Sequence, residues 1–137
     1  MKYFTKDWFE KMQHSSQQAT ADAYAQNLHK QFGDSLPEFY KNFRLHDCRL
    51  KDYGMQGEDY SITIASDCMS GLKQVIFRKA TVLKQDDTIE KASWLYDELY
   101  RTYNGYQLHA LLFRRGQLIE FTVACRDVTL ISAETSR

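Results

Sequence analysis

Two carboxylates and one imidazole are the side chains in this sequence best suited to acid–base or metal chemistry as a group. They are Glu98, His109 and Glu120. Carboxylates and imidazoles transfer protons and ligate divalent metals when the fold brings them into contact. Whether these three side chains converge depends on how the segment that carries them folds.

This segment, residues 94–125, alternates apolar and polar residues with period two, which predicts antiparallel strands. Asn104-Gly105 and Arg115-Gly116 predict two hairpins with two-residue turns, and in that register Tyr100 lies opposite His109. One predicted face is apolar and forms the core: Leu95, Leu99, Leu108, Ala110, Leu112, Ile119, Phe121, Val123 and Cys125. The other predicted face mixes aromatic and ionisable residues: Trp94, Tyr96, Glu98, Tyr100, His109, Leu111, Phe113, Glu120 and Thr122.

The mixed face has three interpretations that the sequence leaves open. A half-exposed sheet face ordinarily carries Glu and His as cross-strand pairs with no further role. Tyr and Trp are favoured at interfaces, so the second interpretation is a docking surface for a protein or peptide. The third is a metal or acid–base site. We predict that any functional surface of this protein includes Tyr96, Glu98, Tyr100, His109 and Glu120.

Other motifs have structural explanations. His46-Asp47 opens a predicted strand, where adjacent side chains point to opposite faces, so we expect it to tie backbone locally. The glycine-rich motifs that cradle phosphates are absent from the sequence. Several basic residues could form a modest basic patch, and as ends or edges of strands they need no further role. They are Lys73, Arg78, Lys79, Arg114 and Arg115.

The three cysteines, Cys48, Cys68 and Cys125, are far apart and include no C-x-x-C pair. This spacing predicts neither a zinc site nor an intramolecular disulfide. Cys125 lies on the predicted apolar face, where a thiol is expected to be inert packing. Charged residues interrupt the N-terminal segment, so we expect no signal peptide and a reducing cytoplasm as the location.

Composition narrows the class of protein. The 137 residues predict one domain, 1–137, with a helical part at 1–44 and a β-sheet part at 45–137. Lys plus Arg and Asp plus Glu both number 18, and this balance argues against nucleic acid or a membrane as partner. No metal or cofactor is expected.

The expected elements follow from a change of period near Leu45. Residues 6–32 predict one helix or two, and a short helix follows from Pro37 to about Phe43. Strands are predicted near 46–53, 59–66, 74–84, 94–102, 106–113 and 118–131, with a bend at Arg126-Asp127. Helices before antiparallel strands predict an α+β fold with a mostly meander β-sheet.

Three segments taken together resemble a known family. They are Met1-Lys2-Tyr3-Phe4-Thr5-Lys6-Asp7-Trp8, Leu45-His46-Asp47-Cys48-Arg49, and Trp94-Leu95-Tyr96-Asp97-Glu98 running into Gly105-Tyr106-Gln107-Leu108-His109. The pattern is similar to a family of small bacterial proteins known as a domain of unknown function. The resemblance implies a bacterial, intracellular protein, and it supplies no catalytic residues.

Two functions from different classes therefore compete. The first is a non-enzymatic module, of an immunity or regulatory type, that binds a protein partner through the mixed face. The second is a small metal-dependent hydrolase that uses Glu98, His109 and Glu120. Balanced charge and the aromatic face favour the binding module over an enzyme.

Overall fold

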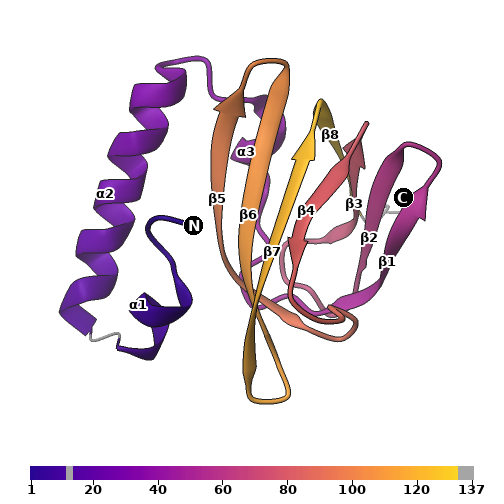
Figure 1. The fold of residues 1–137 in the computed structure, drawn as a ribbon, viewed down its shortest axis with the longest axis horizontal. Helices are drawn as coiled ribbons and strands as arrows, with labels where there is room; N and C mark the ends of the chain where they lie inside the picture. The colour runs from indigo at the N-terminus through magenta and orange to yellow at the C-terminus, as the bar shows by residue number, and fades with distance from the viewer. Residues whose placement is uncertain (12–13, 133–137) are drawn as a thin grey trace.

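The computed structural model describes residues 1–11 and 14–132 of the chain. Within these residues, three helices come first and eight antiparallel strands follow, in the order that Figure 1 traces. The helices are α1 (Lys6–Glu10), α2 (His14–Phe32) and α3 (Glu38–Lys41). The strands are β1 (Leu50–Gln56), β2 (Asp59–Ile64), β3 (Leu72–Arg78), β4 (Thr81–Gln85), β5 (Ser93–Thr102), β6 (Gly105–Arg114), β7 (Gln117–Cys125) and β8 (Asp127–Ser132). The predicted α+β class is confirmed.

A capping residue marks the start of α1, and a glycine marks the end of α2. Thr5 caps α1, because its side-chain oxygen accepts the Trp8 N–H at 3.0 Å. The sequence left open one helix or two over residues 6–32, and the structure has two. Gly33 follows α2 with a φ of +58°, the left-handed conformation expected where a helix ends. None of the described helices is long and apolar enough to cross a membrane.

The strands form two sheets of four, whereas the sequence predicted a single sheet that is mostly a meander. The strand orders are β1-β2-β3-β8 and β4-β7-β6-β5, and only β5-β6-β7 keeps the meander order in the second sheet. The predicted strand 74–84 divides at Lys79, which has a φ of +50°, into β3 and β4 of different sheets. The chain crosses back at Arg126, where the predicted bend is confirmed. The two segments in which the chain passes between the sheets are in contact, because the Arg126 N–H donates to the Arg78 carbonyl at 2.8 Å.

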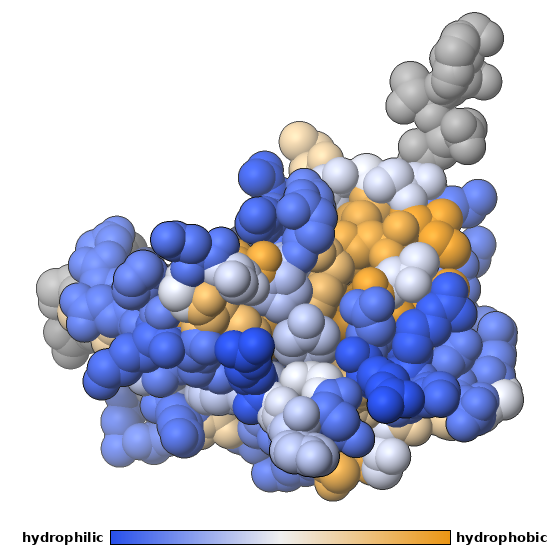
Figure 2. Space-filling model, turned by 90° about the horizontal axis from the view of Figure 1, so that it is seen from above, coloured by the Kyte–Doolittle hydropathy of each residue, from blue (hydrophilic) through white to orange (hydrophobic). Residues whose placement is uncertain are grey.

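The core lies between the two sheets. Tyr60 of β2 contacts Phe121 of β7 with ring centroids 5.5 Å apart, so residues of both sheets share one cluster. The largest side chains buried in this cluster are Trp94, Phe77 and Phe121. Helix α2 runs alongside β5, the edge strand of the β4-β7-β6-β5 sheet, where Tyr24 and Gln31 side chains hydrogen-bond to its backbone (Figure 1). From above, hydrophilic residues cover most of the visible surface, and apolar residues gather toward the end of β8 (Figure 2).

A β-bulge at Leu95 changes the faces predicted for the start of β5. Trp94 pairs with Leu112 and Tyr96 pairs with Leu111, so one extra residue lies between them. Trp94 therefore enters the core and is 0% exposed, while Leu95 leaves the ladder. The prediction of Leu95 in the core and Trp94 on the mixed face is wrong. The segment before β1 lies against this bulge, since the Asp47 N–H donates to the Trp94 carbonyl at 2.7 Å.

The prediction that the protein contains no intramolecular disulfide is also wrong. Cys48 and Cys68 form one, with Cα atoms 5.0 Å apart, and Cys125 stays a buried free thiol. The β1–β2 hairpin explains the pair. Because β1 and β2 are antiparallel, the residue just before β1 and the loop just after β2 meet at the same end of the hairpin. Residues 20 apart in sequence thereby become neighbours.

The disulfide is predicted to stabilise the oxidised protein by about 3 kcal/mol, because it closes a loop in the unfolded chain. Urea unfolding of the wild type with and without dithiothreitol measures this difference. The double variant Cys48→Ser/Cys68→Ser should unfold at the same urea concentration in both conditions. Equal stability of the oxidised and reduced wild type would contradict the prediction.

Candidate functional site

The structure brings all five predicted surface residues onto one face of the β4-β7-β6-β5 sheet. Tyr96, Glu98 and Tyr100 come from β5, His109 from β6 and Glu120 from β7. Residues 1–5 and α1 pack over this face, and α2 runs along its β5 edge (Figure 1). The predicted surface is therefore assembled, and much of it lies beneath the N-terminal segment.

The pairing of β5 with β6 differs from the predicted register by two residues. Thr102 pairs with Gly105, so the turn is Tyr103-Asn104 and Glu98, in place of Tyr100, lies opposite His109. A slip of two keeps every side chain on its predicted face, which is why the cluster survives. Close packing, and not the geometry of a turn, requires a glycine at position 105. A Cβ there would lie 2.2 Å from the Cys125 carbonyl oxygen, because the hairpin rests on β7.

The pairing of β6 with β7 is confirmed as predicted. Arg114 pairs with Gln117 around the Arg115-Gly116 turn, and His109 pairs with Thr122. Leu111 pairs with Glu120, which places Glu120 diagonal to His109 on the same face. The glycine at this turn has a φ of +79°, as a tight hairpin needs.

Glu98 is 0% exposed and accepts four hydrogen bonds. Three come from consecutive backbone N–H groups, those of Lys2 and Tyr3 at 2.9 Å and of Phe4 at 2.7 Å. The Tyr100 hydroxyl donates the fourth at 2.6 Å. A carboxylate has about four acceptor positions, so Glu98 has no capacity left for a ligand. It anchors the N-terminal segment to the sheet.

His109 is held from both ring nitrogens. Its Nδ1 lies 3.3 Å from the Met1 amino nitrogen, and its Nε2 lies 2.9 Å from the Gln107 side-chain oxygen. Burial, followed by the positive Met1 amino group, lowers the pKa of His109. The imidazole is therefore neutral at neutral pH. The Tyr100 ring meets it edge-on, with centroids 5.1 Å apart.

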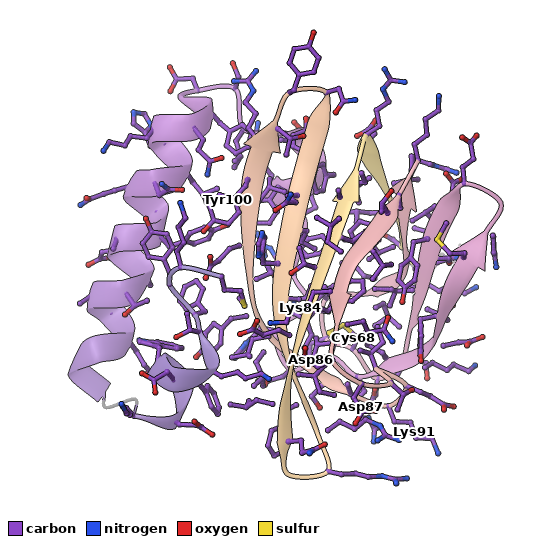
Figure 3. The ribbon with its side chains drawn as sticks, in the orientation of Figure 1. Cys68, Lys84, Asp86, Asp87, Lys91 and Tyr100 are labelled. Carbon is purple, nitrogen blue, oxygen red and sulfur yellow. A yellow bond between two sulfur atoms is a disulfide. The ribbon has the colours of Figure 1, made fainter. Side chains whose placement is uncertain are left out.

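The two remaining residues of the predicted surface are engaged elsewhere. Tyr96 stacks on Phe4 with ring centroids 4.9 Å apart and meets Trp8 edge-on at 5.2 Å. Glu120 accepts a hydrogen bond from Lys84 at 2.8 Å, and this bond raises the pKa of Lys84. Figure 3 labels Lys84 and Asp86, whose side chains also form an ion pair at 4.0 Å. Glu120 is therefore part of an ion pair with β4, apart from the buried carboxylate of Glu98.

A groove of about 470 Å³ leaves part of the predicted surface open to solvent. Tyr100 and His109 line it, together with Lys2, Arg101 and Gln107. The Lys2 ammonium lies 5.6 Å from the centre of the Tyr100 ring. No carboxylate is among the described residues that line this groove, so its charged groups are positive.

A second acid, the half-buried Asp97, was not predicted from the sequence. Its carboxylate accepts hydrogen bonds from the Tyr40 hydroxyl at 2.5 Å and the Trp94 indole N–H at 2.8 Å. Tyr24 extends this network, since its hydroxyl lies 2.7 Å from that of Tyr40 and accepts the Leu99 N–H at 2.6 Å. Burial raises the pKa of Asp97 to about 6. Tyr40 of α3 and Tyr24 of α2 are far from Asp97 in sequence, so strand periodicity alone could not reveal this network.

Within the described ranges 1–11 and 14–132, no three His, Cys, Asp or Glu side chains are placed to hold a metal ion. The three residues predicted to form such a site, Glu98, His109 and Glu120, have other contacts. Glu98 binds backbone N–H groups and Glu120 binds Lys84, so the two carboxylates face different partners. Only His109 of the three lines the open groove.

Fold and site together define a small α+β protein in which the N-terminal segment covers one face of a two-sheet structure and a long helix lies along the edge strand β5. Residues 14–125 match the family described as Protein of unknown function (DUF4085), and the chain belongs to this family. The resemblance to a family of unknown function is thereby confirmed. No curated protein and no solved structure matches the chain.

Replacement of Glu98 by Gln is predicted to destabilise the fold by about 3 kcal/mol, because an amide presents one oxygen and an NH2 group to N–H donors that need acceptors. The exposed Glu90→Gln is the control and should change the free energy of unfolding by less than about 0.5 kcal/mol. Chemical denaturation of both variants checks this. A Glu98→Gln variant as stable as the control would show that the anchor contributes little.

Asp97 is predicted to make the fold more stable in mild acid. Its folded-state pKa of about 6 lies above the unfolded value of about 4, so the folded state takes up a proton first. Between about pH 7 and pH 5 the free energy of unfolding should rise by about 1 kcal/mol more in the wild type than in Asp97→Asn. Urea unfolding at both pH values measures this. A parallel pH response of the two proteins would rule the effect out.

Proposed function

We propose that this protein is a non-enzymatic binding module, of an immunity or regulatory type, that binds an acidic segment of a partner protein in the open groove. Tyr100 and His109 contact the partner, while Tyr96, Glu98 and Glu120 hold the surface in shape. The observation that carries this proposal is the charge of the groove. Its charged lining residues are basic, and the nearest acid, Glu98, is buried and fully hydrogen-bonded.

The groove has the composition of a protein interface. Tyr and Arg are enriched at interface hot spots, and Tyr100 and Arg101, consecutive residues of β5 whose side chains leave the strand on opposite faces, both line the groove. Arg101 is held in place, since its guanidinium lies 5.8 Å from the centre of the Phe32 ring and its backbone N–H donates to the Gln31 side chain at 2.7 Å. A basic groove with fixed side chains loses little entropy when an acidic segment binds.

The geometry favours binding over catalysis. General acid–base work needs groups that exchange protons with a substrate within hydrogen-bond reach. Glu98 is enclosed by its four donors, and both nitrogens of His109 already have neighbours in hydrogen-bond range. No observation favours the hydrolase alternative.

Charge reversal at Arg101 tests the proposal. Tagged wild type, Arg101→Glu and the control Arg115→Glu are used to capture proteins from cells, and the captured partner is then purified for calorimetry. Arg115 is exposed at the β6–β7 turn and lies outside the groove. We expect Arg101→Glu to weaken the partner's binding at least about ten-fold and Arg115→Glu to leave it unchanged.

Two results would count against the groove. A partner that binds all three proteins equally would place the interface elsewhere. The melting temperatures of the three proteins are compared as well, because Arg101→Glu must weaken binding without unfolding the protein. A partner whose binding segment is basic would contradict the predicted charge complementarity.

A further inference from the structure

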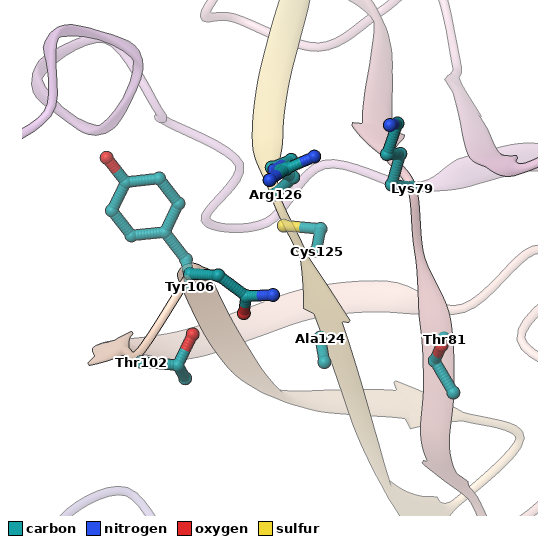
Figure 4. Close-up of a pocket in the computed structure, with 8 residues that line it drawn as sticks. Lys79, Thr81, Thr102, Tyr106, Ala124, Cys125 and Arg126 are labelled. Carbon is teal, nitrogen blue, oxygen red and sulfur yellow. The ribbon is translucent and has the colours of Figure 1, made fainter.

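A second cavity, of about 280 Å³, lies on another part of the molecule, where three turns of the chain meet (Figure 4). Lys79 belongs to the β3–β4 turn, Arg126 to the β7–β8 corner, and Thr102 and Asn104 to the end of the β5–β6 hairpin. The proposed function does not use this cavity. Gly105 helps to form it, because only a residue without a Cβ lets the hairpin rest on the Cys125 backbone.

The two cations of this cavity have no acidic partner within 4.0 Å in the part of the chain that the structure describes. The nearby acids are engaged with other groups. Asp59 pairs with Arg78 at 2.9 Å, and Asp127 accepts the Val128 N–H at 2.8 Å. Lys79 and Arg126 are therefore available to neutralise a bound anion.

Backbone hydrogen bonds fix the two turns that carry these exposed cations. Arg126 donates its N–H to the Arg78 carbonyl at 2.8 Å, and Lys79 donates its N–H to Asp59 at 3.1 Å. The turn that carries Lys79 and the corner that carries Arg126 are thus joined through adjacent residues. Figure 4 shows both side chains above those of Thr81 and Thr102.

Other polar side chains of the cavity are neutral and can donate hydrogen bonds as well as accept them. Thr81 and Thr102 contribute hydroxyls and Asn104 contributes an amide. Cys125 also lines the cavity, and burial raises the pKa of its thiol to about 12, so it adds no negative charge at neutral pH. The cavity therefore combines two cations with neutral donors and has no carboxylate among its described lining residues.

We propose that this cavity binds a phosphate group, either as free phosphate or as the phosphomonoester of a small molecule. A guanidinium and an ammonium are the side chains that bind phosphate oxygens most strongly, and hydroxyl and amide donors complete their coordination. The cavity is larger than the five non-hydrogen atoms of phosphate fill, which leaves room for part of the molecule that carries the group.

Titration of the full-length protein with inorganic phosphate, and separately with ribose 5-phosphate, tests the proposal. The backbone amide resonances of Thr102, Asn104 and Arg126 are followed by NMR while sodium chloride keeps the ionic strength constant. We expect saturable shifts at these amides. Tighter binding of the ester identifies a small phosphorylated molecule as the ligand, and equal binding identifies free phosphate.

Matched variants show whether the two cations are responsible. Lys79→Gln and Arg126→Gln should each weaken phosphate binding about ten-fold. Lys91→Gln and Arg115→Gln are the controls, because both residues are exposed and, like Lys79, lie at turns with positive φ. Shifts that do not saturate, or affinities unchanged in both cavity variants, would overturn the proposal.

Discussion

The contact between the Glu98 carboxylate and the backbone of residues 2–4 organises one whole side of this protein. A buried carboxylate is costly unless its oxygens are satisfied, and Glu98 obtains three of its four donors from the N-terminal segment. This contact seats Phe4 on Tyr96 and brings Lys2 over Tyr100. The N-terminal segment also forms one wall of the open groove, where it crosses the sheet. The packing of the aromatic residues and the shape of the groove thus depend on the Glu98 side chain.

Much of the fold is predictable because it follows from local rules. The change of hydrophobic period near Leu45 separates helices from strands, and the Arg115-Gly116 turn sets the register of β6 with β7. Features that long-range geometry sets cannot be predicted from local rules. The bulge at Leu95 moves Trp94 into the core without any change in alternation that the sequence displays. The first crossing between the two sheets falls at a left-handed residue, Lys79, inside a continuous run typical of one strand.

The candidate site shows the same limit. Alternation predicts that Glu98 and His109 share a face, and a register slip of two residues leaves that result intact. Alternation cannot predict what covers the face, because three of the four donors to Glu98 are backbone groups more than ninety residues away. The disulfide between Cys48 and Cys68 was missed for a related reason, since the hairpin between them brings together cysteines that are well separated in sequence.

The two sheets are joined along both sides. On one side the Arg126 N–H binds the Arg78 carbonyl, where the chain crosses between the sheets. On the other side Trp94 at the start of β5 donates its N–H to the Cys48 carbonyl, just before β1, at 2.8 Å. Neither sheet can slide or peel away without breaking a seam and exposing the shared core. The sheets therefore act as one cooperative unit, in which amide hydrogens of the central strands exchange with solvent only when both layers open together.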